Sequence, residues 1–154
     1  MHMKPTKKGQ GATEYLVILA VVLIVALVVI ALLGFFPGVG GAARESQSAS
    51  YWSGAQPFSI TSFKVSNTTV TLVMANRLSE KLTLTGVDFD GSGLTNLSNT
   101  SFKGGEEKVV VGTLGSSCGT SGEGFEYDVE LTYDQGSVSG KKQFGDKPLV
   151  GKCT

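Results

Sequence analysis

The chain has 154 residues, a formal net charge of zero and a charged fraction of only 17%, so no overall field favours nucleic acid as a partner. Its length allows one compact domain. A single histidine, His2, and two cysteines without C-x-x-C spacing exclude the usual zinc and thioredoxin-like patterns. The hydrophobic residues gather in one stretch near the N-terminus, so two chemically different parts are joined in one chain.

Residues 1–9 form a short basic leader that carries Lys4, Lys7 and Lys8. The first charges after the following apolar run are Arg44 and Glu45, which offset each other. Positive charge before a membrane span holds that end in the cytoplasm. We therefore expect the N-terminus in the cytoplasm and everything after the apolar run outside, with the precursor inserted in the cytoplasmic membrane.

Residues 10–34 are predicted to form one long hydrophobic helix. No charged side chain interrupts the run from Tyr15 to Leu33, and about 20 helical residues at ~1.5 Å each span a hydrocarbon core of ~30 Å. The run is longer than the apolar region of a secretory signal peptide, which has about 7 to 15 residues. The small residues before Arg44 leave one alternative open, which is cleavage after Ala43 and release of a secreted domain.

The junction between leader and helix reads Lys7-Lys8-Gly9-Gln10-Gly11-Ala12-Thr13-Glu14-Tyr15-Leu16. It resembles the class III signal peptides of archaeal type IV pilins, closely over residues 7–33 and more weakly over 44–58. The resemblance implies that a prepilin peptidase cuts between Gly9 and Gln10 and leaves the helix on the product. Glu14 then becomes the fifth mature residue, where type IV pilins carry a glutamate.

This resemblance implies a structural subunit of an extracellular pilus. Its partners would be identical subunits in a helical homopolymer, the prepilin peptidase, and the assembly platform with its ATPase; the role would be surface adhesion. Three alternatives stay open: a membrane-anchored monomeric binding domain, a secreted monomeric domain, and a subunit similar to archaeal flagellin.

Gln10 and Glu14 are the predicted assembly residues. Leader removal creates an α-amine at Gln10, which can pair with the Glu14 carboxylate of a neighbouring subunit. Truncating one partner of a buried ion pair costs roughly 3 to 5 kcal/mol, so the pair would enforce axial register. The alternative is that Glu14 only favours the helix N-terminus through the macrodipole, worth about 0.3 to 1 kcal/mol.

Residues 35–57 are predicted to form a hinge and a stem. The segment Gly34–Gly41 contains Pro37 and four glycines, so a kink or an unwound stretch is expected there. A short helix can resume over Ala42–Ser53, and Pro57 then requires extended chain before it.

Residues 58–154 are predicted to form an all-β head, so that the whole chain is α+β. About seven short strands between turn signals predict an immunoglobulin-like sandwich, which is similar in architecture to the heads of archaeal pilins and flagellins. The alternation from Phe125 to Tyr133 predicts one continuous strand with one buried face. Phase slips at Ser62 and Gly86 predict bulges. The other expected strands are 58–65, 69–75, 81–89, 108–114 and 138–144.

Cys118 and Cys153 are predicted to form a disulfide, because the head is expected outside the reducing cytosol; two free thiols are the alternative. Acceptor sequons begin at Asn67, Asn96 and Asn99, so these residues are candidates for N-glycosylation.

The segment Asp88–Gly93 starts like a calcium loop, but Asn99 stands where an EF-hand needs its glutamate, so we expect a turn. No nucleophile with a base and no phosphate-cradling loop is recognisable in the sequence. The sequence therefore predicts a protein that is not an enzyme and that has no cofactor and no metal site.

Overall fold

The computed structural model describes residues 10–34 and 39–154, and the chain divides into two compact units, Met1–Gly40 and Gly41–Thr154. The predicted leader residues Lys7, Lys8 and Gly9 lie outside the described residues. The same holds for residues 35–38 of the predicted hinge.

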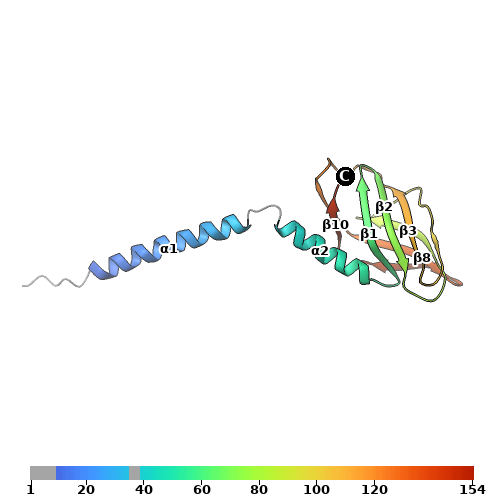
Figure 1. Cartoon of the computed structure of the whole chain (residues 1–154), viewed down its shortest axis with the longest axis horizontal. Helices are drawn as coiled ribbons and strands as arrows, with labels where there is room; N and C mark the ends of the chain where they lie inside the picture. The colour runs from blue at the N-terminus through green and yellow to red at the C-terminus, as the bar shows by residue number, and fades with distance from the viewer. Residues whose placement is uncertain (1–9, 35–38) are drawn as a thin grey trace, which may run out of the picture. The chain divides into compact units, whose positions relative to one another are not determined.

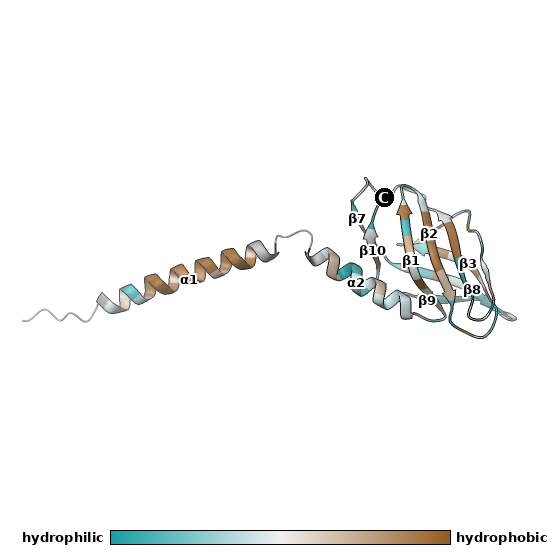
Figure 2. Cartoon of the chain, in the orientation of Figure 1, coloured by the Kyte–Doolittle hydropathy of each residue, from teal (hydrophilic) through white to brown (hydrophobic). Residues whose placement is uncertain are grey.

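Helix α1 (Gln10–Gly34) is continuous, and apart from a hydrophilic stretch near its start most of its length is hydrophobic (Figures 1 and 2). Its large side chains between Tyr15 and Ile30 are 41–66% exposed, and none of the apolar window within Gly11–Ala31 is buried. By length and composition this helix can cross a membrane, either as an anchor or as a signal sequence. The predicted N-terminal apolar helix is confirmed.

Helix α2 (Val39–Gly54) confirms the helical stem and begins three residues before the predicted start at Ala42. The sequence predicted a kink or an unwound stretch over Gly34–Gly41, and of this segment residues 39–41 are helical. Each glycine costs about 1 kcal/mol relative to alanine in a helix. The contacts that the later turns of α2 make with the head offset this cost.

The head consists of antiparallel sheets (Figure 1). The first sheet has the order β1 (Phe58–Ser66), β2 (Thr69–Asn76), β6 (Glu107–Thr113). The second has the order β4 (Ser92–Gly93), β3 (Leu82–Phe89), β8 (Val129–Gln135), β9 (Val138–Phe144), and β5 (Ser101–Phe102) also pairs with β3. A third, two-stranded sheet joins β7 (Gly124–Tyr127) to β10 (Leu149–Lys152).

The buried sides of these sheets meet in one hydrophobic cluster. At its centre the Phe58 ring of β1 makes T-shaped contacts with Phe102 of β5 and Tyr133 of β8, at centroid distances of 5.2 and 5.6 Å. Phe63 contacts Phe125 of β7 in the same way at 6.1 Å. Alternate residues of β2, β3 and β8 enter this cluster, so the outer faces of the first two sheets point away from it.

One strand predicted from the alternation of apolar and polar residues alone is wrong. The expected strand from Phe125 to Tyr133 is two strands in two different sheets, interrupted at Asp128. The Asp128 amide donates to the Asp90 carboxylate at 2.7 Å, and the Asp90 amide donates to the Asp128 carbonyl at 2.9 Å. This exchange replaces ladder hydrogen bonds at Asp128, so β7 and β8 pair with different partners.

The bulges predicted at Ser62 and Gly86 are confirmed by register shifts in the β1–β2 and β3–β8 pairings. A third shift, between β8 and β9, occurs at Asp134, whose carboxylate accepts a hydrogen bond from the Gly140 amide at 2.8 Å. The sequence did not predict β4, β5 or β10, because such short strands exist only through their partners.

Gln143 of β9 joins the edges of the first two sheets. Its buried amide accepts a hydrogen bond from the Phe58 backbone N–H at 2.9 Å and donates to the Phe58 carbonyl at 2.8 Å. The side chain thus satisfies both backbone groups of a β1 residue, as a neighbouring strand would.

Candidate functional site

The predicted assembly residues lie at the start of α1. Gln10 is the first residue of the helix, and Glu14 lies one turn later with its side chain exposed. Glu14 borders a shallow hollow of about 360 Å³ together with Thr13, Val17 and Ile18. None of the ion pairs among the described residues includes Glu14. This carboxylate therefore projects from a mainly apolar surface.

The first turn of α1 contains no acidic residue. The effect of the macrodipole falls off within the first turn of a helix. Glu14 is the fifth residue of α1, and both the pairing role and the macrodipole role of this carboxylate stay predictions.

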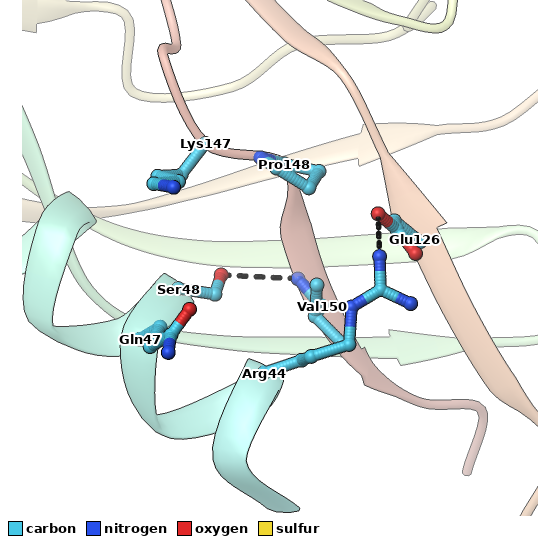
Figure 3. A pocket seen from close by; sticks show the side chains of 7 residues that line it. All are labelled: Arg44, Gln47, Ser48, Glu126, Lys147, Pro148 and Val150. Carbon is cyan, nitrogen blue, oxygen red and sulfur yellow. Dashed lines mark hydrogen bonds and ion pairs between the residues drawn. The ribbon is translucent and has the colours of Figure 1, made fainter. Parts of the chain in front are cut away.

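The stem docks on the head through Arg44, Ser48 and Trp52, which lie at i, i+4 and i+8 on one face of α2. Trp52 is 0% exposed and its indole N–H donates to the Lys147 carbonyl at 3.1 Å. The Ser48 hydroxyl accepts the Val150 amide at 3.1 Å, and Arg44 forms an ion pair with Glu126 of β7 (Figure 3). The sequence pattern did not single out Arg44 and Ser48 as contacts of the head, although their helical spacing from Trp52 was the available signal.

Further contacts hold both ends of this interface between α2 and the β-sheets, which we call the seam. The Tyr51 hydroxyl accepts a hydrogen bond from the Asp146 amide at 3.0 Å, and the Tyr51 and Trp52 rings meet edge to face. Trp52 lies so close to Gly145 that a side chain there would overlap its ring. At the C-terminus of α2, Arg77 donates to the Ser53 carbonyl and to the Ser59 hydroxyl. The stem from Gly41 onward and the β-sheets accordingly form one packed unit.

The seam contains a small hollow of about 130 Å³ (Figure 3). Its lining is mostly polar and includes the Arg44–Glu126 ion pair, Gln47 and Ser48. This volume is large enough for a few water molecules and too small for a cofactor. Within ranges 10–34 and 39–154, no three His, Cys, Asp or Glu side chains are grouped to hold a metal ion.

Cys118 and Cys153 form the predicted disulfide, with their Cα atoms 5.8 Å apart. The bond fixes the C-terminal tail beside β1, where Cys153 bridges Val65 in parallel and the Thr154 amide donates to the Val65 carbonyl at 2.9 Å (Figure 1). The chain-entropy model assigns roughly 3 to 4 kcal/mol to closing a loop of this length. The tail also covers backbone groups at the edge of β1.

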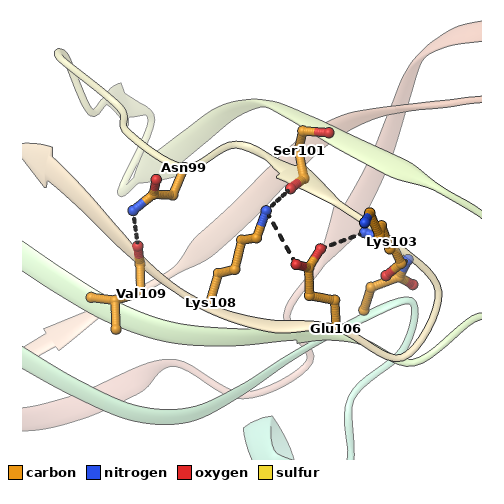
Figure 4. A network of polar contacts seen from close by, with 7 residues as sticks. Asn99, Ser101, Lys103, Glu106, Lys108 and Val109 are labelled. Atoms are coloured by element: carbon orange, nitrogen blue, oxygen red, sulfur yellow. Dashed lines mark hydrogen bonds and ion pairs between the residues drawn. The ribbon is translucent and has the colours of Figure 1, made fainter.

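The three sequon asparagines are all exposed and all have positive φ, at 52°, 55° and 55° for Asn67, Asn96 and Asn99. Asn67 lies in the two-residue turn between β1 and β2. The Asn99 amide nitrogen, which would carry a glycan, donates to the Val109 carbonyl at 2.9 Å (Figure 4). All three asparagines are therefore accessible, but Asn99 must first break a hydrogen bond.

The calcium-like segment is a hairpin turn, as predicted. Asp90 and Gly91 connect the paired residues Phe89 and Ser92, and both have positive φ, at 52° and 77°. Positive φ at both central residues is typical of a type I′ turn, for which Asp-Gly is a preferred sequence.

A polar network holds the turn between β5 and β6 (Figure 4). The Glu106 carboxylate accepts the Lys103 amide at 2.7 Å and lies 3.4 Å from the Lys108 ammonium, which donates to the Ser101 carbonyl. The hydrogen bond from Lys103 lowers the pKa of Glu106, against a smaller opposing effect of desolvation, and Lys108 lowers it further.

We expect this turn to lose stabilisation in acid. Because the pKa of Glu106 is lower in the folded than in the unfolded chain, the stabilisation is complete above the unfolded value of about 4.3 and is lost as pH falls through the folded value. Carboxyl ¹³C chemical shifts should show Glu106 titrating at lower pH than it does in urea. Equal titration in both conditions would contradict the network, and Glu106→Gln should remove the acid-dependent change in the Lys103 amide signal.

No protein-family model matches the chain, and a search of curated proteins found no match either. The function is therefore inferred from the residues and their geometry.

Proposed function

We propose that this chain is the structural subunit of an extracellular type IV-like pilus that polymerises through α1 after removal of residues 1–9. The observation that carries the proposal is that none of the apolar window of α1 is buried, whereas the head of the same chain buries its own core. Such a helix requires apolar surroundings on all sides. Lipid supplies them before assembly, and the helices of identical subunits supply them in the filament.

The chemistry of assembly starts at the N-terminus. Lys7 and Lys8 hold the leader at the anionic cytoplasmic surface, and a prepilin peptidase cuts between Gly9 and Gln10. The new α-amine of Gln10 then pairs with the Glu14 carboxylate of the next subunit. The exposed position of Glu14 among apolar neighbours, beyond the first helical turn, supports this role.

An assembly platform and its ATPase move the processed subunit from the membrane into the filament, and the head faces the outside. The disulfide between Cys118 and Cys153 suits an oxidising exterior. The exposed Asn67, Asn96 and Asn99 suit glycosylation there. We assign the head to the immunoglobulin-like sandwiches because its two main antiparallel sheets share one core, and we assign adhesion as its role.

The N-terminal residue of the protein recovered from cells, combined with electron microscopy of the cell surface, tests this function. A mature chain that starts at Gln10 within filaments is the expected result. Arg44 at the N-terminus would identify a secreted domain, and an intact leader without filaments would identify an anchored monomer. Filaments that rotate and drive swimming would identify a subunit of the flagellin kind.

The Gly9→Val variant is expected to accumulate with its leader attached. A β-branched side chain restricts the backbone and crowds the position next to the cut. Immunoblotting of membranes measures the ratio of precursor to mature chain. Gly11→Val is the matched control, because a Cβ at Gly11 meets no other atom within 4 Å, and it should be processed. Efficient removal of the leader from Gly9→Val would contradict the assigned junction.

A further inference from the structure

Acidic side chains and an exposed aromatic ring lie together on the outer face of the sheet that contains β3, β8 and β9. Cross-strand pairing places Asp88 opposite Glu130, and Glu130 opposite Phe144. The three side chains form a row across adjacent strands beside a hollow of about 520 Å³, which Lys142 also lines. The Phe144 ring is 62% exposed, so an apolar surface and carboxylates lie side by side.

This hollow carries unbalanced negative charge. Three carboxylates line it, those of Asp88, Asp128 and Glu130, against the single ammonium of Lys142. Lys142 forms an ion pair with Glu130, and its pKa is raised by Glu130 and to a smaller extent by Asp88. Like charges directly opposite each other destabilise a sheet. A further cation would relieve the repulsion between Asp88 and Glu130.

The opposite outer face of the head carries the complementary charge. Lys64 and Lys152 immediately precede Val65 and Cys153, the two residues of the parallel bridge between β1 and the C-terminal tail. Val65 and Cys153 are buried whereas both lysines are exposed, so the lysines point outward on the same side. Neither lysine takes part in an ion pair within the described part of the chain.

We propose that the heads associate head to tail, with Lys64 and Lys152 of one copy entering the Asp88–Glu130–Phe144 hollow of the next. The alkyl stem of a lysine covers the exposed Phe144 ring while its ammonium meets the carboxylates. A second copy supplies these cations because both patches belong to this chain and lie on the outer sides of different sheets: Lys64 precedes the buried Val65 of β1, and Asp88 lies between the buried Val87 and Phe89 of β3. Among the described residues, no three His, Cys, Asp or Glu side chains lie close enough together to hold a metal ion.

This inference rests on the proposed filament and adds a contact between its heads. An interface between two different patches of the same molecule is heterologous, and when its rotation does not close a ring it generates an open helical polymer. The head contact is heterologous, as is the proposed pairing of Gln10 with Glu14 of the next subunit, and it would fix the rotation of each head against its neighbour.

Carbodiimide treatment of purified filaments tests the contact directly, because this reagent joins a carboxylate and an amine only where they touch. Filaments assembled from mixed ¹⁴N and ¹⁵N subunits should yield peptides that link Asp88 or Glu130 to Lys64 or Lys152, with mixed isotope pairs. Such pairs prove that the link is between copies. Filaments that yield no such peptide, or yield links from the hollow to another protein, would overturn the inference while leaving the filament proposal intact.

Charge exchange provides a second test. Lys64→Glu and Asp88→Lys are each expected to lower filament yield by about threefold to tenfold and to increase sensitivity to salt, and the double variant should recover. Lys81→Glu, an exposed lysine outside both patches, is the matched control. Phe144→Ala should weaken the filaments, whereas Val138→Ala, an exposed residue at the other end of β9, should not. Equal effects of targets and controls would overturn the contact.

Discussion

Cells that express only the Glu14→Gln variant are expected to remove the leader normally and to assemble few or no long filaments. The substitution keeps the size of the side chain and removes its charge, so insertion and processing should survive. It leaves the α-amine of Gln10 on the neighbouring subunit buried without a counter-ion. Breaking a buried ion pair in this way costs roughly 3 to 5 kcal/mol, and the loss recurs at each subunit of the polymer.

Electron microscopy of sheared filaments, together with immunoblotting of the processed chain, measures this effect. Glu45→Gln is the matched control, because it removes one carboxylate from α2 in the other compact unit and should leave filament length unchanged. If Glu14 acted only through the helix macrodipole, its loss would cost about 0.3 to 1 kcal/mol. Filaments of normal length and yield from correctly processed Glu14→Gln would show that this carboxylate has no register role.

Trp52→Ala is expected to lower the free energy of unfolding of the head by about 3 to 5 kcal/mol, the usual cost of truncating a buried Trp. Trp52 is fully buried between the stem and the loop after β9, and its indole also satisfies the Lys147 carbonyl. Without this ring, the stem loses its most deeply buried apolar side chain. Urea unfolding of the full chain in detergent, followed by circular dichroism of the β-sheets, measures the change.

Tyr51→Phe separates packing from hydrogen bonding at the same seam. It keeps the ring that packs on Trp52 and removes the hydroxyl that accepts the Asp146 amide, so a loss of about 1 kcal/mol is expected. A Trp52→Ala variant no less stable than Tyr51→Phe would contradict the assignment of Trp52 as the main anchor of the stem.

Local sequence pattern was enough to predict the elements that form without a partner elsewhere in the chain. The uninterrupted apolar run predicted α1, because a helix satisfies its own backbone hydrogen bonds. The Asp90-Gly91 pair predicted its turn, since two consecutive residues determine that geometry. The interruptions of alternation at Ser62 and Gly86 predicted the bulges, because a bulge shifts the phase of the side chains within its own strand.

Local sequence pattern does not determine which strands pair. The alternation from Phe125 to Tyr133 gives the buried face correctly, but it does not say which strand lies alongside. The break at Asp128 is produced by Asp90, which lies in another hairpin. In the same way, nothing near Gln143 in the sequence indicates that its amide satisfies Phe58.

The sequence by itself indicated the apolar helix, the stem and the β head, because composition and local pattern decide these features. The cut between Gly9 and Gln10 stays a proposal that rests on the resemblance of residues 7–33 to archaeal type IV pilins. Only the tertiary structure decided how the stripe of Arg44, Ser48 and Trp52 docks on the head. It alone placed Phe144 beside Glu130 and Lys64 on the opposite face. Contacts between residues far apart in the chain depend on sheet order and register, and these are set by the packing of the whole core.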